Sequence, residues 1–311
     1  MISVIICTYN RPNEIRRAIE SILANAYSDY ELLIVDQSNT DETREIVEKY
    51  IYKDSHIKYL YSSRSKSRAL NLGVKKAEGE IIAFTDDDCA VSEDWLDKIV
   101  STFDSLKTDS IVVFGSVKAA KHDIRKGFIP DNKIREVELK GPLSIKKVSF
   151  GIVGMNMIVK KTFFEKVGYF DEVLGPGAEL KAAEEYDITY RALKKEFKIL
   201  FVPGIKVEHY GFKSWEEATA LFEGYVIGTI GTFCKHIRCM DFNAFLLLLV
   251  SVFTDLVEYT KSVVDRGLTV FSLLYILPCM YVIYFFSFLM GILKSMNFAV
   301  DKKNMVYRTK T

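Results

Sequence analysis

Ile81-Ile82-Ala83-Phe84-Thr85-Asp86-Asp87-Asp88 is a short apolar run that ends in three consecutive aspartates. Such a run is typical of a buried strand. Three adjacent carboxylates repel one another and are costly to bury, so a divalent cation at the mouth of the strand best explains them. A solvated turn is the alternative. A calcium loop fits poorly, because Ala90 and Val91 stand where such a loop needs an oxygen ligand and a glycine. The triplet therefore indicates a metal shared with a phosphate.

Strand and helix patterns alternate on both sides of this run. Strands are expected at 3–8, 31–35, 57–61, 81–85 and 111–117, and helices at about 12–23, 40–50, 65–77 and 95–106. This alternation predicts an α/β fold with a doubly wound, mostly parallel sheet and helices on both faces. Ligands of such sheets bind beyond the carboxyl ends of the strands, where Thr8, Asp36 and Asp86 should lie. The GxGxxG fingerprint is absent, which argues against a nicotinamide enzyme.

Composition excludes several classes of protein. Of the 311 residues 49% are hydrophobic and the formal net charge is +1, which argues against disorder and against general attraction to nucleic acid. The five cysteines form no CxxC pair and are odd in number, so a disulfide framework or a zinc ribbon is not expected. Met1 leads directly into a strand pattern with no basic segment before it, which predicts no signal peptide and a catalytic part on the cytosolic side.

The C-terminal part is more apolar. Residues 268–293 carry no charge, and a run of that length can cross a bilayer as a helix. Residues 242–257 are shorter and contain Asp255. Basic residues precede, separate and follow the two segments, and the positive-inside rule then favours a hairpin of two crossings. The alternative places both segments in the membrane interface. Truncation after Phe212 is expected to leave a soluble domain.

The middle of the chain is less regular. Residues 118–147 are basic and polar with several glycines and prolines, which indicates a mobile loop, either functional or an ordinary solvated connection. Regular structure is expected again at 148–159 and in a helix at about 184–195.

Five segments, taken in order, resemble the family 2 glycosyltransferases with the GT-A fold, of the bacterial membrane-associated type. They are SVIICTYNRP from Ser3, LLIVDQSNTDET from Leu32, SRALNLGVKKAEGEIIAFTDDDC from Ser67, GMNMIVKKTFFEKVGYFDEVLGPGAE from Gly154 and EEYDITYRAL from Glu184. The resemblance covers about residues 1–212. It implies a nucleotide-sugar-binding half at 1–117, an acceptor-side half of the same domain at 118–214, and an amphipathic and transmembrane helical region at 215–311.

On the donor side, the resemblance implies that Thr8, Asn10 and Arg11 line the nucleotide pocket. Asp36 would contact the uracil or ribose. Arg68 stands where the family often carries a basic residue and could pair with phosphate, although solvation is an equally good explanation of its charge.

The aspartates correspond to the DxD motif of the family. Asp86 is implied to face the ribose or the metal, Asp88 to bind the metal directly, and Asp87 to lie at the substrate between them. A hard cation such as manganese or magnesium bridges carboxylate and diphosphate oxygens. His209 resembles a histidine that completes the metal site in some relatives, although a lone histidine is more often structural.

On the acceptor side, a Glu-Asp pair of the family corresponds here to Glu184-Glu185. The resemblance implies Glu185 as the catalytic base, with Glu184 as the alternative and Asn156 in the acceptor segment. Helical spacing brings Asp187 and Arg191 near Glu184, so part of this cluster could be a structural ion-pair network.

The resemblance implies an inverting transferase that moves a sugar from a nucleoside-diphosphate sugar, a UDP-sugar being favoured, to a hydroxyl of a lipid-linked or polysaccharide acceptor in cell-surface glycan synthesis. The expected location is the cell membrane, with the catalytic domain on the cytoplasmic side and membrane lipid as a partner. The alternatives are a nucleotidyltransferase, which also uses a metal at the end of a parallel sheet, and a non-catalytic membrane scaffold of the same fold.

Overall fold

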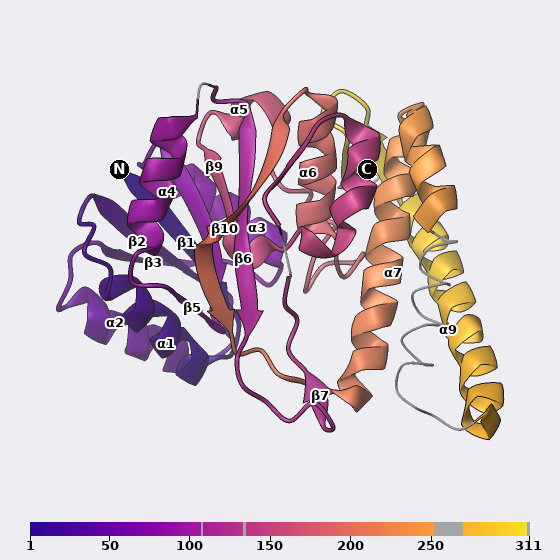
Figure 1. Ribbon diagram of the computed structural model, residues 1–311, viewed down its shortest axis with the longest axis horizontal. Helices are drawn as coiled ribbons and strands as arrows, with labels where there is room; N and C mark the ends of the chain where they lie inside the picture. Colours follow the sequence, from indigo (N-terminus) through magenta and orange to yellow (C-terminus); the bar gives the residue numbers. More distant parts are fainter. Residues whose placement is uncertain (107, 133–134, 252–269, 310–311) are drawn as a thin grey trace.

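The computed structural model describes residues 1–106, 108–132, 135–251 and 270–309. Nine of its strands form one mixed sheet in the order β3-β2-β1-β4-β9-β6-β10-β5, with β8 paired to β10 (Figure 1). These strands are β1 (Ile2–Thr8), β2 (Tyr30–Asp36), β3 (Ile57–Tyr61), β4 (Ile81–Asp86), β5 (Cys89–Val91), β6 (Ile111–Ala119), β8 (Val137–Leu139), β9 (Met157–Lys160) and β10 (Lys198–His209).

Helices cover both faces of the sheet, as the alternating pattern predicts. One face packs against α1 (Pro12–Leu23), α2 (Glu42–Ile51) and α4 (Trp95–Ser105), and the other against α3 (Lys66–Lys76), α5 (Phe163–Val167) and α6 (Glu184–Lys194). Alternate residues of β1 enter the two cores, with Val4 and Ile6 on one side and Ile5 on the other. Burial of both faces explains why β1 is a continuous apolar run.

The strands that carry the predicted site end at one edge of the sheet. β1 pairs in parallel with β2 and β4, so that Thr8 lies opposite Asp36 and Cys7 opposite Asp86. β9 runs antiparallel between β4 and β6, and β5 and β8 run antiparallel to β10. The prediction of an α/β fold with polar residues gathered at one sheet edge is confirmed, and the sheet is mixed.

The middle segment departs from the expected long loop. Within 118–147 the chain forms β7 (Gly127–Phe128), which pairs with β11 (Lys213–Ser214), and β8 on the edge of the main sheet. The regular structure expected at 148–159 consists of two 3-10 helices, η1 (Pro142–Gly151) and η2 (Gly154–Asn156), followed by the start of β9. Two-residue and three-residue strands lack a readable alternation, so the sequence pattern misses them.

The C-terminal region packs against the sheet domain. It consists of α7 (Trp215–Arg238), a helical stretch at 242–251, α9 (Val270–Met296), and the hairpin of β12 (Phe298–Asp301) and β13 (Val306–Thr309). Helices α7 and α9 lie side by side (Figure 1). Phe233, Ala244 and Leu247 belong to the same core cluster as the sheet residues. These contacts make the region part of one packed body with the predicted acceptor-side half.

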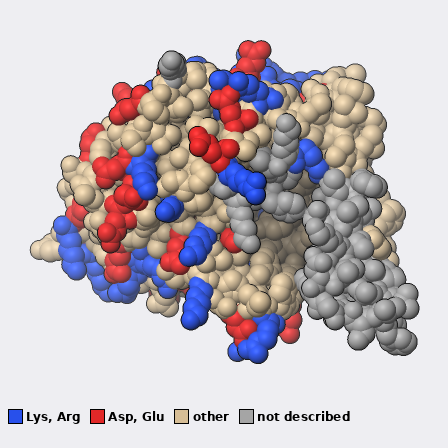
Figure 2. All heavy atoms as spheres, viewed as in Figure 1, with Lys and Arg blue, Asp and Glu red and all other residues tan. Residues whose placement is uncertain are grey.

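Within the described ranges, no helix is long and apolar enough to cross a membrane. The loop of the predicted hairpin, between the segments 242–257 and 268–293, falls within residues 252–269, which lie outside the described residues. Figure 2 shows basic and acidic side chains interspersed over the viewed face, without one large patch of either sign.

Candidate functional site

The three aspartates lie in the tight turn from β4 to β5. Asp86 is the last residue of β4, and the side chains of Asp87 and Asp88 are almost completely buried. The three carboxylates are therefore held close together at the carboxyl end of a central strand. Burial of like charges is costly, so the arrangement requires cations close by.

Arg11 supplies one of these cations. It lies just before α1, and its Nη1 donates to Asp87 Oδ1 at 2.8 Å and to Asp88 Oδ2 at 2.7 Å. Burial raises the pKa of Asp87 to about 6, although the charge of Arg11 opposes this rise. Arg11 therefore bridges two of the three aspartates from the side that the resemblance assigns to the nucleotide.

His209 faces the same turn from the end of β10. Its Nε2 lies 3.3 Å from Asp88 Oδ1, and its Nδ1 lies 2.7 Å from the carbonyl oxygen of Pro130. A carbonyl can only accept, so Nδ1 carries a proton. Nε2 then either binds a second proton or presents its lone pair to a cation. Burial alone would raise the pKa of Asp88, but the hydrogen bond from His209 and the charge of Arg11 outweigh it and lower this pKa.

The donor atoms fit a divalent cation. One ligand atom each of Asp88, Cys89 and His209 lie within 4.8 Å of one another. Burial raises the pKa of the Cys89 thiol, which disfavours the thiolate that a soft metal would select. A Cβ at Gly211 would lie 2.5 Å from both Asp88 Oδ2 and His209 Nε2, so glycine keeps this space open. A carboxylate and an imidazole are suitable ligands for manganese, and the carboxylates also suit magnesium.

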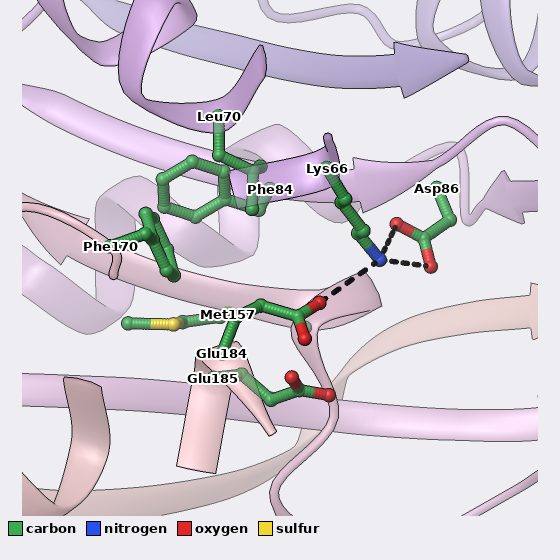
Figure 3. A pocket seen from close by; sticks show the side chains of 9 residues that line it. Lys66, Leu70, Phe84, Asp86, Met157, Phe170, Glu184 and Glu185 are labelled. Carbon is green, nitrogen blue, oxygen red and sulfur yellow. Dashed lines mark hydrogen bonds and ion pairs between the residues drawn. The ribbon is translucent and has the colours of Figure 1, made fainter. Parts of the chain in front are cut away.

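Lys66 connects the aspartates to the acceptor-side carboxylates. It is the first residue of α3, and its Nζ lies 2.9 Å from Asp86 Oδ1 and 3.9 Å from Glu184 Oε1 (Figure 3). Burial opposes the charge of Lys66, but Asp86 and Glu184 outweigh this and raise its pKa well above the ordinary value. Lys66 is therefore a fixed cation between the two halves of the site.

Glu184 and Glu185, the first residues of α6, line one pocket with Lys66 and Asp86 (Figure 3). Burial and the charge of Glu185 raise the pKa of Glu184 well above its usual range, which favours its protonated form. Glu185 Oε2 is buried and has no hydrogen-bond partner among the described residues. An unpartnered carboxylate oxygen in a pocket can accept a proton from a bound hydroxyl.

Three of the predicted donor-side residues lie at or just beyond the carboxyl ends of β1 and β2. Thr8 is buried at the end of β1. Asp36 is also buried, and it accepts from the backbone N–H of Ser38 at 2.8 Å and from the Tyr59 hydroxyl at 2.9 Å. Asn10 has a left-handed backbone conformation and its Oδ1 accepts from the backbone of Asn39.

A second pocket opens next to Asp36 at the ends of β2 and β3. Its lining residues are Ser38, Asn39, Thr40, Asp41, Arg44, Tyr59 and Tyr61. The arrangement offers hydrogen-bonding groups and aromatic rings at the sheet edge, which are the features that a base or a sugar requires.

Two predicted substrate residues lie elsewhere. Asn156 is fully buried, and its amide accepts from Trp95 Nε1 and donates to the carbonyls of Ser116 and Ile205. The prediction that Asn156 binds substrate does not fit this position. Its amide oxygen and amide nitrogen are both engaged in hydrogen bonds that hold η2 against the sheet. Arg68 is exposed and pairs with Glu172, so it does not reach the aspartates.

The sequence reasoning missed Lys66 and Tyr225. Lys66 stands two residues before Arg68, and the turn at Ser65 that starts α3 aims the earlier residue into the site. Tyr225 on α7 is half exposed, and burial together with the charges of Glu185 and Glu184 raises its pKa to about 12. No local motif marks either residue, because each depends on the packing of a distant element.

Comparisons with known proteins identify the family of this chain. The family model described as Glycosyl transferase family 2 matches residues 3–168, which is more than half of the chain. Glycosyltransferase AglE of Haloferax volcanii is 27% identical over 183 residues, covering 58% of this chain and 59% of that protein. The uncharacterized glycosyltransferase RP339 of Rickettsia prowazekii is 25% identical over 195 residues, covering 61% and 58%. The chain thus spans about three fifths of the length of these relatives.

Solved structures share the fold. The mannosyltransferase PcManGT from Pyrobaculum calidifontis, in complex with GDP-Man and Mn²⁺, superposes with a TM-score of 0.57 at 17% identity, covering 95% of this chain and 85% of that one. TarS 1–349 of S. aureus in complex with UDP-GlcNAc gives 0.55 at 21% identity, covering 74% and 66%. The likeness confirms the predicted GT-A type of α/β fold, but the prediction of a mostly parallel sheet is corrected to a mixed one, because β5, β8 and β9 all pair antiparallel to their neighbours.

Proposed function

This chain belongs to glycosyl transferase family 2, and from that premise we propose that it transfers a sugar, with inversion, from a nucleoside-diphosphate sugar to an acceptor hydroxyl. The observation that carries the proposal is one pocket lined both by Asp86, the first residue of the aspartate turn, and by Glu185, whose Oε2 has no hydrogen-bond partner among the described residues. UDP-GlcNAc and GDP-Man appear in the names of the structural neighbours, and a UDP-sugar remains the favoured donor here.

In the proposed reaction, one side of the pocket removes a proton from the acceptor and the other side holds the leaving diphosphate. Glu185 Oε2 takes the proton of the acceptor hydroxyl, and the hydroxyl oxygen forms a bond to the anomeric carbon. The bond from that carbon to the diphosphate oxygen breaks, and its electron pair leaves with the diphosphate. Attack from the face opposite the leaving group inverts the anomeric centre.

The leaving diphosphate needs positive charge. Lys66 and Arg11 supply two fixed cations at the aspartate turn. A divalent ion held by Asp88 and His209, with Asp86 beside it, would neutralise the diphosphate further when bound. Manganese and magnesium are the proposed cofactors, and two structural neighbours were solved with Mn²⁺.

Calorimetry with UDP and with GDP tests the donor site. We expect binding in the presence of Mn²⁺ or Mg²⁺ and a loss of at least about tenfold in affinity with chelator, because phosphate binding at the turn then lacks its bridging cation. Equal affinity with and without chelator would remove the metal from the proposal. Absence of binding for both nucleotides would refute the donor class.

We also propose that the C-terminal helices lie at the cytoplasmic surface of the cell membrane and bring the site close to a lipid-linked acceptor used in cell-surface glycan synthesis. Support comes from a strip of exposed apolar side chains. Its members are Phe242, Phe245, Leu249 and Val250 on the stretch 242–251, and Tyr281, Val282, Phe285, Phe286, Leu289, Met290, Leu293 and Met296 on α9. The exposed Lys302 and Lys303 next to α9 would favour anionic lipid.

Co-sedimentation of the full chain with phosphatidylcholine vesicles, with and without phosphatidylglycerol, tests this placement. The double change Phe285→Glu and Phe286→Glu should weaken binding by at least about tenfold, since each buried phenyl side chain contributes about 1.5–3 kcal/mol. Tyr52→Glu, at an exposed aromatic position after α2, is the matched control and should bind normally. Equal binding by both variants would contradict the proposed surface.

A further inference from the structure

A cluster of buried charges lies one turn along α6 from the acceptor-side carboxylates. Asp187 accepts from Lys235 Nζ at 2.7 Å, from His236 Nε2 at 2.9 Å and from Arg191 Nε at 2.9 Å. All four side chains are completely buried. Lys235 and His236 belong to the last turn of α7, so the contacts join two helices far apart in the sequence.

Asp171 extends the cluster to the end of the chain. It accepts from Lys235 Nζ at 2.7 Å and from the backbone N–H of Tyr307 at 2.8 Å. The Tyr307 hydroxyl in turn donates to the carbonyl of Gly231 on α7 at 2.6 Å. Asp171, in the segment after α5, therefore links the ammonium group of Lys235 on α7 to the backbone of Tyr307 on β13.

The charges of this cluster balance. Asp171 and Asp187 face Lys235 and Arg191, and burial lowers the pKa of His236, which keeps its imidazole neutral. Burial would raise the pKa of Asp187, but Lys235 and Arg191 outweigh it and lower this pKa. Breaking one buried pair leaves an uncompensated charge, so the members hold one another in place.

Close packing fixes the same helix one and two turns before Lys235. A Cβ at Gly228 on α7 would lie 2.4 Å from the carbonyl oxygen of Ala182, and one at Gly231 would lie 2.8 Å from Leu180 Cδ1. Both partners belong to the segment that leads into α6, which begins at Glu184. Helix α7 thus touches the approach to α6 as well as its first turn.

We propose that Lys235 and His236 are positioning residues that fix α6 so that Glu184 and Glu185 face Asp86 across the pocket. They lie outside residues 3–168, which the family model matches. Among the described residues their side-chain hydrogen bonds and ion pairs are to Asp171 and Asp187, neither of which lines the pocket. The kinetic consequence rests on the proposed function, whereas the structural consequence does not. The C-terminal region would in this way support the geometry of the site without contacting the substrate.

Hydrogen–deuterium exchange on the full chain tests the structural consequence. His236→Leu removes the hydrogen bond to Asp187 without changing the charge, and the amides of α6 should exchange about tenfold faster, as expected for loss of one hydrogen bond to a charged group. His236→Gln keeps an N–H donor in place and should restore slow exchange. Tyr307→Phe removes a single hydroxyl and serves as a milder second variant, with a smaller increase in the same amides. Helix α4 is the internal control.

Calorimetry with UDP and Mn²⁺ on the same variants separates positioning from general damage. We expect an unchanged dissociation constant, within about twofold, together with a kcat for sugar transfer that falls about tenfold at unchanged donor KM. Unchanged exchange of α6 in both His236→Leu and Tyr307→Phe would overturn the inference. An equal loss of UDP affinity and kcat, not restored in His236→Gln, would overturn it as well. Failure of the wild-type chain to bind UDP or GDP would count against the proposed function alone, since the exchange measurement needs no ligand.

Discussion

Two groups of aspartates in this chain have opposite properties, although most members of both groups are buried. Asp171 and Asp187 are sealed between α6, α7 and β13, and two cations balance their charges. Asp86, Asp87 and Asp88 lie at the edge of the sheet, where Arg11 and Lys66 supply two cations for three carboxylates. The sealed group is complete without a ligand, whereas the open group has room and charge for another cation.

The difference between the two groups shows that burial of acidic residues does not by itself identify a functional site. The informative signs are the surplus of negative charge, the imidazole of His209 aimed at Asp88, and the unpartnered oxygen of Glu185 across the pocket. A balanced, closed cluster stabilises the packing of elements, and an unbalanced, open one can bind and react.

Truncation after Phe212 should have the largest effect. It removes Lys235 and Tyr307 and leaves Asp171 and Asp187 without their main partners, at a cost of about 3–5 kcal/mol for each broken buried pair. A domain has about 5–15 kcal/mol of stability in all. We therefore expect an unfolded or aggregated product, which reverses the expectation of a soluble domain drawn from the sequence. Circular dichroism and size-exclusion chromatography check this, and a cooperative melt at the full-length temperature would show the sealed cluster to be dispensable.

Asp88→Ala should have the next largest effect, on the open cluster. Loss of the direct metal ligand removes charge stabilisation of several kcal/mol from the leaving group, so sugar transfer should fall by about 10²- to 10³-fold. The chelator dependence of UDP binding should disappear together with it. Asp94→Ala, at an exposed pair with Lys98, is the control and should leave both measurements unchanged. Chelator-sensitive binding in Asp88→Ala would place the metal elsewhere.

Glu185→Gln tests whether the carboxylate on the acceptor side of the pocket acts as the base. The amide is nearly the same shape and cannot take a proton, so transfer should fall by about 10²-fold or more while UDP binding is retained. Steady-state kinetics and calorimetry on one preparation separate the two effects. Glu184→Gln is the matched variant, and a larger loss there would show that Glu184 is the base and the assignment is wrong by one residue.

Glu184→Gln should also change how stability depends on pH. Burial raises the pKa of Glu184 in the folded chain, so its stabilising contribution is present below the unfolded pKa of about 4.3 and is lost as the pH rises through the folded pKa. Glutamine is neutral at every pH. The melting temperature of the variant should therefore exceed that of the wild type by a margin that grows between about pH 5 and pH 8. A margin that shrinks over this range would contradict the raised pKa.

Arg68→Ala should have the smallest effect. Its partner Glu172 is also exposed, and such surface pairs contribute about 0.2–1 kcal/mol. UDP affinity should change by less than about threefold, because the guanidinium does not contact the aspartates. Lys66→Met on the same helix is the contrast, and it should weaken UDP binding more strongly. A greater loss in Arg68→Ala would restore the phosphate role that its position in the sequence suggests.

Much of the fold could be predicted from the sequence because its signals are local. Apolar runs followed by polar residues place Thr8, Asp36 and Asp86 at one sheet edge, and parallel strand order then brings them together. The aspartate triplet likewise indicates a metal before any neighbour is known, since adjacent carboxylates are unfavourable wherever the chain folds.

Only the tertiary structure decided what faces these residues. Lys66 rather than Arg68 reaches the pocket because of where α3 starts, and Asn156 is held inside because Trp95 and the strand carbonyls surround it. The roles of Lys235 and His236 depend on contact between α7 and α6, a helix that ends at Lys194, about 40 residues before Lys235. Contacts between distant segments leave no periodic trace in a sequence, because they are fixed by packing and charge balance in three dimensions.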